Sequence, residues 1–201
     1  MAVASHVDAA MTAVPRERFL PPGQRRHRRR DAPLPIGHGQ TNSQPTTVRQ
    51  MLELLDVQPG DRVLDVGSGS GWTTVLLAWL TGARGSVVGV ERVPDLVVFG
   101  AANVEAAGMP WAHVREAVPG RFGAPSQAPF ERILVSAQAQ ELPPDLVAQL
   151  APGGVLVVPV AGRMLRVTAS TDDTGGPVVE EHGWYRFVPL VADPPDEPQV
   201  D

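Results

Sequence analysis

The pattern of hydrophobic and polar positions divides the chain near residue 46. Residues 47–55 place apolar side chains at intervals of three and four, which is the spacing of one helical face. From Arg62 to Val160, short apolar runs typical of buried strands alternate with helical segments. Strands and helices that alternate in this way form a parallel sheet with helices on both faces. The pattern therefore predicts a single α/β domain.

Turn residues, mainly glycine and proline, separate the predicted elements. We expect helices at residues 7–14, 47–55, 72–80, 94–107 and 144–150. We expect strands at residues 62–66, 86–90, 113–115, 133–136, 155–160, 164–169 and 184–190. A polar hairpin at residues 170–177 joins the last two strands, so the sheet should end in an antiparallel C-terminal strand.

The segment before residue 46 lacks a regular pattern. Residues 31–45 are rich in glycine, proline and polar residues, which predicts a loop, and a loop of this length is more often functional than idle. The arginine-rich run 25–30 has no interleaved aromatic residues, which favours a solvated loop. We expect three regions: an N-terminal helix and substrate or cofactor loop (1–45), a cofactor-binding domain (46–191) and a flexible acidic, proline-rich tail (192–201).

Composition restricts the class of protein. The 201 residues are 43% hydrophobic and 19% charged, which suits one globular domain. The formal net charge of −5 gives no reason to expect a nucleic-acid partner. Cysteine is absent, which excludes disulfides, thiolate metal sites and cysteine nucleophiles, and we predict no metal. The pattern of a secretory signal is missing, and no apolar run approaches the ~18 residues of a membrane span, so we expect a cytoplasmic monomer.

The most informative motif follows the first strand of the regular region. Residues 63–71 read VLDVGSGSG, so a buried strand enters a turn with glycine at every second position. Glycine permits positive φ and close approach of a ligand to the backbone. The G-x-G-x-G spacing differs from the G-x-G-x-x-G of dinucleotide folds. Asp65 suits the cationic sulfonium and amino-acid tail of S-adenosylmethionine, although turn amides are an alternative partner for this carboxylate.

An acidic residue ends the second strand. Glu91 follows residues 86–90 and lies about 20 residues beyond the glycine turn. A carboxylate at this place accepts hydrogen bonds from ribose hydroxyls in dinucleotide folds. The alternative is a strand-end residue that caps the next helix. Together with the glycine turn, Glu91 favours a cofactor that contains ribose.

Several motifs together resemble the protein-L-isoaspartate O-methyltransferase family. Residues 33–45, PLPIGHGQTNSQP, closely resemble the signature loop of that family, and residues 14–21, VPRERFLP, resemble its N-terminal motif. The glycine turn and residues 129–135, 149–154 and 187–190 match in order. The resemblance covers nearly the whole chain and implies a Rossmann-like class I methyltransferase fold that uses S-adenosylmethionine.

The resemblance implies methyl transfer to the free carboxylate of L-isoaspartyl residues in damaged proteins, so the expected partner is a peptide or protein substrate. That carboxylate, with an ordinary pKa near ~3.9, is ionised at neutral pH and needs no strong base to attack a methyl group. The family's loop serine lies between cofactor and substrate, which implies Ser43 as the catalytic residue. The predicted cofactor-binding residues are Gln40, Thr41, Asn42, Ser43, Asp65, Gly67, Ser68, Gly69, Ser70, Gly71, Glu91 and Arg92.

The chain also departs from the family pattern. Family members usually carry Gly-Asp-Gly after the third strand, where the aspartate contacts adenine, but this chain has Val118-Pro119-Gly120. Asn42 replaces a residue that is usually apolar. Three functions therefore stay open: isoaspartyl repair, a related carboxyl methyltransferase acting on another acidic group such as aspartate in a modified peptide, and a non-catalytic S-adenosylmethionine-binding protein. The glycine spacing disfavours a fourth, an NAD-linked oxidoreductase.

Overall fold

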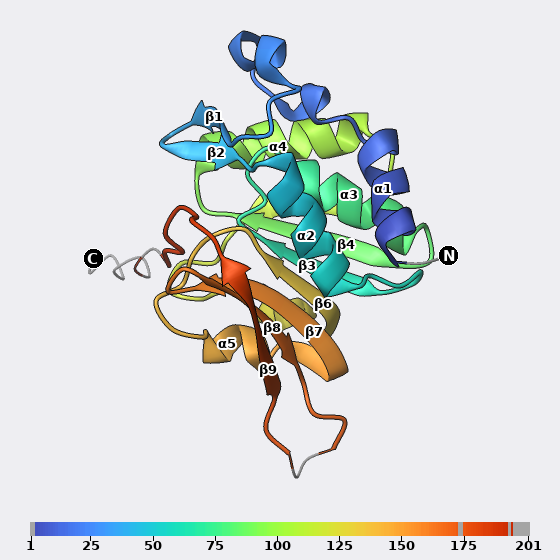
Figure 1. Ribbon diagram of the computed structural model, residues 1–201, viewed down its shortest axis with the longest axis vertical. Helices are drawn as coiled ribbons and strands as arrows, with labels where there is room; N and C mark the ends of the chain where they lie inside the picture. The colour runs from blue at the N-terminus through green and yellow to red at the C-terminus, as the bar shows by residue number, and fades with distance from the viewer. Residues whose placement is uncertain (1–2, 173–174, 193, 195–201) are drawn as a thin grey trace, which may run out of the picture.

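A computed structural model describes residues 3–172, 175–192 and 194 (Figure 1). Within these residues, seven strands form one sheet in the order β5-β4-β3-β6-β7-β8-β9, and two more form the separate hairpin β1-β2. The strands are β1 (Leu34–Gly37), β2 (Gln40–Asn42), β3 (Arg62–Val66), β4 (Ser86–Glu91), β5 (Ala112–Glu116), β6 (Phe130–Val135), β7 (Leu150–Val160), β8 (Arg163–Thr168) and β9 (Val178–Trp184). The α-helices are α1 (Val3–Ala13), α2 (Pro45–Leu55), α3 (Trp72–Thr81), α4 (Pro94–Ala106) and α5 (Pro144–Val147), and the 3-10 helices are η1 (Arg16–Phe19), η2 (Pro22–His27) and η3 (Pro125–Gln127).

The sheet is parallel from β5 to β7 and antiparallel from β7 to β9. This arrangement confirms the predicted α/β fold with an antiparallel C-terminal strand. Parallel strands need long crossover connections, and α3 and α4 supply the first two of them. No helix in the described ranges is long and apolar enough to span a membrane.

Alternation along the strands divides the apolar side chains between two cores. In β3, Val63 belongs to a core with α1, α2 and α3, whereas its neighbour Leu64 belongs to a second core with α5. Both side chains are fully buried. The helical spacing predicted for residues 47–55 is the buried face of α2, which begins at Pro45, where the missing amide hydrogen costs no helical hydrogen bond. The sheet, covered on both faces, positions the loops at its carboxyl ends.

Three predicted elements differ from the structure. Residues 31–45 contain the hairpin β1-β2, because residues 37–39 all take positive φ and turn the chain tightly. The last strand is β9, Val178–Trp184, and not residues 184–190. Six of its seven residues are exposed, so this edge strand shows no buried pattern in the sequence. The helix predicted at 144–150 is the single turn Pro144–Val147, because β7 already begins at Leu150.

Two other predicted segments lie partly outside the described residues. The connection predicted at residues 170–177 joins β8 to β9, and residues 173–174 within it are not described. Of the predicted tail at residues 192–201, only Ala192 and Pro194 are described.

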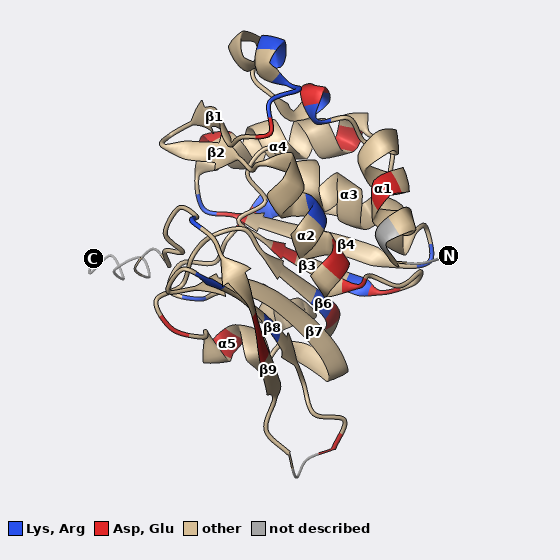
Figure 2. Ribbon diagram, in the orientation of Figure 1, with Lys and Arg blue, Asp and Glu red and all other residues tan. Residues whose placement is uncertain are grey.

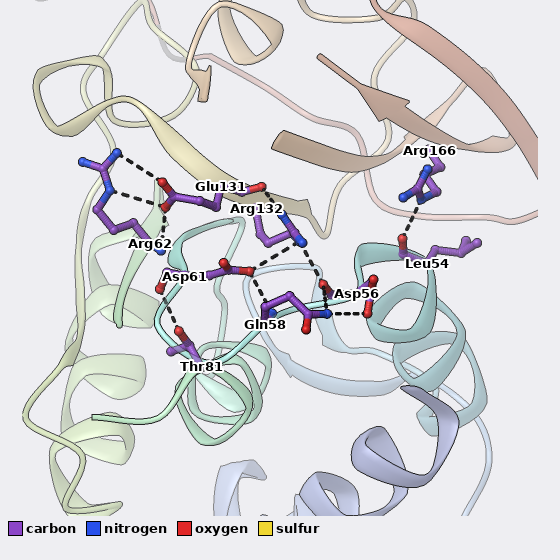
Figure 3. Close-up of polar contacts among 9 residues, drawn as sticks. All are labelled: Leu54, Asp56, Gln58, Asp61, Arg62, Thr81, Glu131, Arg132 and Arg166. Atoms are coloured by element: carbon purple, nitrogen blue, oxygen red, sulfur yellow. Dashed lines mark hydrogen bonds and ion pairs between the residues drawn. The ribbon is translucent and has the colours of Figure 1, made fainter. Parts of the chain in front are cut away.

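A cluster of polar side chains lies at the amino-terminal ends of β3 and β6 (Figure 3). Arg132 Nε donates to the carbonyl oxygen of Asp56 at 3.0 Å and lies 3.5 Å from Asp61 Oδ2. The backbone N–H of Arg62 donates to Glu131 Oε2 at 2.8 Å. Burial raises the pKa of Asp61, which the hydrogen bond from the Gln58 N–H and the charge of Arg132 oppose. These contacts join the turn between α2 and β3 to β6, at the end of the strands opposite to the glycine turn.

Candidate functional site

One cavity, of about 170 Å³, lies at the carboxyl ends of the parallel strands. Its walls come from the segment at β1-β2, the turn after β3, the end of β4, the loop after β5, the residues after β6 and the C-terminal segment. Open α/β sheets bind their ligands at this edge. Most of the predicted cofactor-binding residues line it, namely Gln40, Thr41, Asn42, Ser43, Gly67, Ser68, Gly69, Ser70, Glu91 and Arg92. The structure thus brings the signature loop and the glycine turn, distant in the sequence, to one cavity.

The glycine turn needs its glycines for backbone conformation and for close packing. Gly67, Gly69 and Gly71 all have positive φ, with values of 77°, 52° and 82°. A Cβ on Gly71 would lie only 2.9 Å from the carbonyl oxygen of Gly100 in α4, and a Cβ on Gly100 would lie 2.6 Å from that of Gly69. Gly71 itself does not line the cavity, although it was predicted to bind the cofactor. Its place is at the contact between the turn and α4.

The carboxylate of Glu91 organises the turn from the end of β4. Glu91 Oε2 accepts a hydrogen bond from the Gly69 N–H at 2.9 Å, and Oε1 accepts from the Arg92 and Val93 N–H groups at 2.8 and 3.0 Å. The residue is only 6% exposed, yet it lines the cavity. An ionised carboxylate has about four acceptor positions, so three amide donors leave capacity for a ligand. Glu91 therefore both holds the backbone between β4 and α4 and lines the cavity.

Asp65 has a different environment from the one expected. It is fully buried, and its Oδ2 accepts hydrogen bonds from the hydroxyls of Thr73 and Thr74, both at 2.7 Å. Burial raises its pKa to about 6, the two threonine hydrogen bonds lower it, and the charge of Glu91 raises it further. Asp65 does not line the cavity, unlike Thr73 beside it. In the structure, its carboxylate joins the end of β3 to the first turn of α3.

Asn42 connects the signature loop to two other parts of the site. Its Oδ1 accepts a hydrogen bond from Arg16 Nε at 2.5 Å, and its Nδ2 donates to Ser70 Oγ at 2.9 Å. Arg16 also donates through NH2 to the Asn42 carbonyl at 2.7 Å, and its guanidinium lies 5.6 Å from the ring centre of Trp72. Burial lowers the pKa of Arg16 to about 10, against the attraction of Asp31, so Arg16 stays charged at neutral pH. A buried charged link thus holds the loop against the glycine turn.

The structure adds residues to which the sequence analysis assigns no role. The segment Val188–Val191 lines the cavity, together with Ser136 and Ala137. A two-way pairing holds this segment: the Gln138 N–H donates to the Val188 carbonyl, and the Leu190 N–H donates to the Gln138 carbonyl, both at 2.7 Å. In the sequence, only the family-like motif at residues 187–190 pointed to a role for this segment. The pattern of neighbouring residues does not reveal a pairing between residues so far apart in the chain.

Comparisons with known proteins agree with this geometry. A family model for protein-L-isoaspartate(D-aspartate) O-methyltransferase (PCMT) matches residues 1–194. The chain belongs to this family. It is 45% identical to a protein-L-isoaspartate O-methyltransferase of Aeropyrum pernix, over 92% of this chain and 72% of that protein. A crystal structure from Plasmodium falciparum, described as a protein-L-isoaspartate O-methyltransferase with S-adenosyl-L-homocysteine, has a TM-score of 0.78 at 28% identity and covers 94% of this chain and 91% of that chain.

The loop after β5 departs from the expected family pattern within this cavity. Val118, Pro119 and Gly120, which stand where Gly-Asp-Gly is usual, do not line the cavity, and Val118 is 45% exposed. Arg121 and Phe122, which follow them, do line it. In this member of the protein-L-isoaspartate O-methyltransferase family, Arg121 and Phe122 are therefore the residues of this loop that follow the expected motif and line the cavity.

Proposed function

We propose that this chain transfers a methyl group from S-adenosylmethionine to the free carboxylate of L-isoaspartyl residues in damaged proteins, as part of protein repair. One observation carries the proposal: residues 40–43 of the signature loop and residues 67–70 of the glycine turn line the same cavity. A methyltransferase must hold its methyl donor and its methyl acceptor in contact. The signature loop and the glycine turn each form part of the wall of this cavity, so both molecules could bind there together. The membership of the chain in the protein-L-isoaspartate O-methyltransferase family supports the same reaction.

The residues of the cavity fit S-adenosylmethionine. The hydroxyl of Ser68 is buried and, within the described residues, has no hydrogen-bond partner, and Ser68 lines the cavity. A ligand with polar groups would satisfy this oxygen, since buried polar atoms are rarely left unpaired. We assign the ribose hydroxyls to Glu91 and the amino-acid part to residues 67–70, with Arg92 and residues 40–43 flanking the cofactor. Asp65 and Gly71 then support the turn from behind.

The proposed chemistry depends on position more than on acid or base catalysis. When bound, S-adenosylmethionine supplies an electrophilic methyl group on a positively charged sulfur. The substrate carboxylate is already ionised at neutral pH, so the chain has no proton to remove. Ser43 Oγ would donate a hydrogen bond to one carboxylate oxygen and leave the other free to attack. Ile36, Phe122 and Val188–Val191 supply apolar walls that exclude water.

A paired-peptide assay tests the reaction. The protein is incubated with labelled S-adenosylmethionine and two peptides of identical sequence, one with L-isoaspartate and one with aspartate, and base-labile methyl ester is counted. We expect ester only on the isoaspartyl peptide. Ester on the aspartyl peptide alone would favour the related carboxyl methyltransferase, and no ester on either peptide would favour a non-catalytic protein.

A thermal-shift measurement tests the cofactor separately from turnover. We expect S-adenosylhomocysteine to raise the melting temperature, because a ligand that binds only the folded state stabilises it. NAD should have no such effect, since the turn lacks the dinucleotide spacing. A shift with NAD and none with S-adenosylhomocysteine would contradict the assignment.

A further inference from the structure

An exposed basic segment, residues 25–30, lies on η2 and the coil after it (Figure 2). Five of its six residues are arginines, and all five are exposed. Residues 16–31 contain seven arginines and two acidic residues, whereas the whole chain has a net charge of −5. Positive charge is therefore concentrated here, against the sign of the protein as a whole.

Two guanidinium groups of the basic segment are free to bind a partner. Arg25 donates to the carbonyl of Leu20, Arg26 contacts His27, and Arg28 pairs with Glu17 at 2.9 Å. Arg29 and Arg30, in contrast, make no side-chain hydrogen bond or ion pair with another residue of the described ranges. A guanidinium presents its donors in a planar fork that matches a carboxylate.

Arg16 and Asp31 link the basic segment to the signature loop. Arg16 donates to the carbonyl of Arg30 at 3.1 Å, and the same guanidinium donates to the carbonyl of Asn42 at 2.7 Å. Asp31 Oδ1 accepts from the Thr46 N–H and its Oδ2 accepts from Gln44 Nε2, both at 2.9 Å. Arg30 is therefore linked through Arg16 to Asn42, the residue before Ser43, and Asp31 contacts Gln44, the residue after it. The coil that carries Arg29 and Arg30 therefore lies beside the signature loop, whose residues 40–43 line the cavity.

We infer that the basic segment binds acidic residues that flank the methyl-accepting residue in a polypeptide substrate. This inference rests on the proposed function, because it requires that the cavity receives a carboxylate of a polypeptide. Carboxylates on either side of the acceptor would pair with Arg29 and Arg30 while the acceptor enters the cavity. The field of the basic segment would also attract acidic polypeptides before contact. The segment has no aromatic side chains on which nucleic-acid bases could stack, which favours an acidic peptide over RNA.

Flanking charge in the substrate tests the inference. Three isoaspartyl peptides with the same core carry glutamate, glutamine or lysine on both sides, and kcat and KM are measured at low and high salt. We expect the glutamate peptide to have a KM about 2- to 10-fold below that of the glutamine peptide, as for two exposed ion pairs, with an equal kcat. The preference should shrink as salt screens the charges. The lysine peptide should have the highest KM.

Variants locate the effect on the basic segment. Arg29→Gln and Arg30→Gln, singly and together, should reduce the preference for glutamate flanks and leave kcat on the glutamine peptide unchanged. Arg84→Gln is the matched control, because Arg84 is also exposed and without a polar partner in the described residues but lies between α3 and β4, at the opposite ends of the strands. It should keep the full preference. Equal KM values for all three peptides, or an equal loss in Arg84→Gln, would overturn the inference.

A direct binding measurement separates this inference from the proposed function. Fluorescence anisotropy with labelled glutamate- and glutamine-flanked peptides, with S-adenosylhomocysteine present, needs no turnover. If no peptide is methylated, the proposed function fails, and the anisotropy still shows whether Arg29 and Arg30 hold acidic peptides. If the isoaspartyl peptides are methylated equally well, only the inference fails. A labelled RNA oligonucleotide that binds more tightly than the glutamate peptide, through the same two arginines, would also overturn it.

Discussion

Replacement of Asn42 by alanine tests whether the buried link between the signature loop and the glycine turn stabilises the site. Asn42 is only 4% exposed, and its side chain bonds to Arg16 Nε and to Ser70 Oγ. Asn42→Ala removes both bonds and leaves one donor of a buried cation without its partner. A hydrogen bond to a charged group contributes about 1.5–3 kcal/mol and a neutral one about 0.5–1.5 kcal/mol. We therefore expect the free energy of unfolding to fall by about 2–4 kcal/mol.

Urea unfolding followed by circular dichroism measures this loss, and Asn42→Asp is the control. Aspartate keeps an acceptor for Arg16, and the Ser70 hydroxyl can turn to donate to it, so this variant should lose much less stability than Asn42→Ala. The dissociation constant of S-adenosylhomocysteine should rise in the alanine variant, because Asn42 and Ser70 both line the cavity. An unchanged urea midpoint in Asn42→Ala would refute the argument. An equal loss in both variants would show that stability depends on the Nδ2 donor of Asn42 and not on its acceptor for Arg16.

Three further variants test single residues of the site. Ser43→Ala should lower the methylation rate by about 10²-fold with little change in cofactor affinity, as for the loss of one oriented donor; full turnover would make Ser43 a structural residue. Glu91→Gln should weaken binding of S-adenosylhomocysteine by at least about tenfold in calorimetry, because it removes charge-assisted hydrogen bonds; an unchanged constant would show that the ribose binds elsewhere. Asp65→Asn tests the raised pKa. Because the pKa of Asp65 rises from 3.8 to about 6 on folding, the ionised carboxylate lowers stability above pH 6, and this cost disappears as the pH falls from 6 toward 3.8. We expect Asp65→Asn to gain up to roughly 3 kcal/mol relative to wild type at pH 8 and to lose this advantage near pH 4; a difference independent of pH in urea unfolding would contradict the raised pKa.

An element of the fold could be predicted from the sequence wherever burial requires a regular pattern of apolar residues. The helix over residues 47–55 was visible because one side of α2 is buried, and β3 was visible because four of its five residues are buried. The same logic missed β9, whose exposed edge carries no such period. The strand β9 instead pairs with its neighbour β8. Two ion pairs join these strands, one between Arg166 and Glu180 and one between Arg163 and Glu181. The pattern of residues along one strand does not show which residues of another strand it will pair with.

The sequence by itself determined the α/β order, the glycine turn and the presence of a carboxylate at the end of β4, because each depends on neighbours in the chain. Only the tertiary structure decided what those groups contact. It placed Asp65 behind the turn, under two threonine hydroxyls, and not in the cavity. It joined Asn42 to Arg16 and to Ser70, 26 and 28 residues away in the sequence, and it brought Val188–Val191 to the cavity. Such contacts depend on how the two cores pack, since a buried polar side chain bonds to whichever partner the packed chain brings within reach.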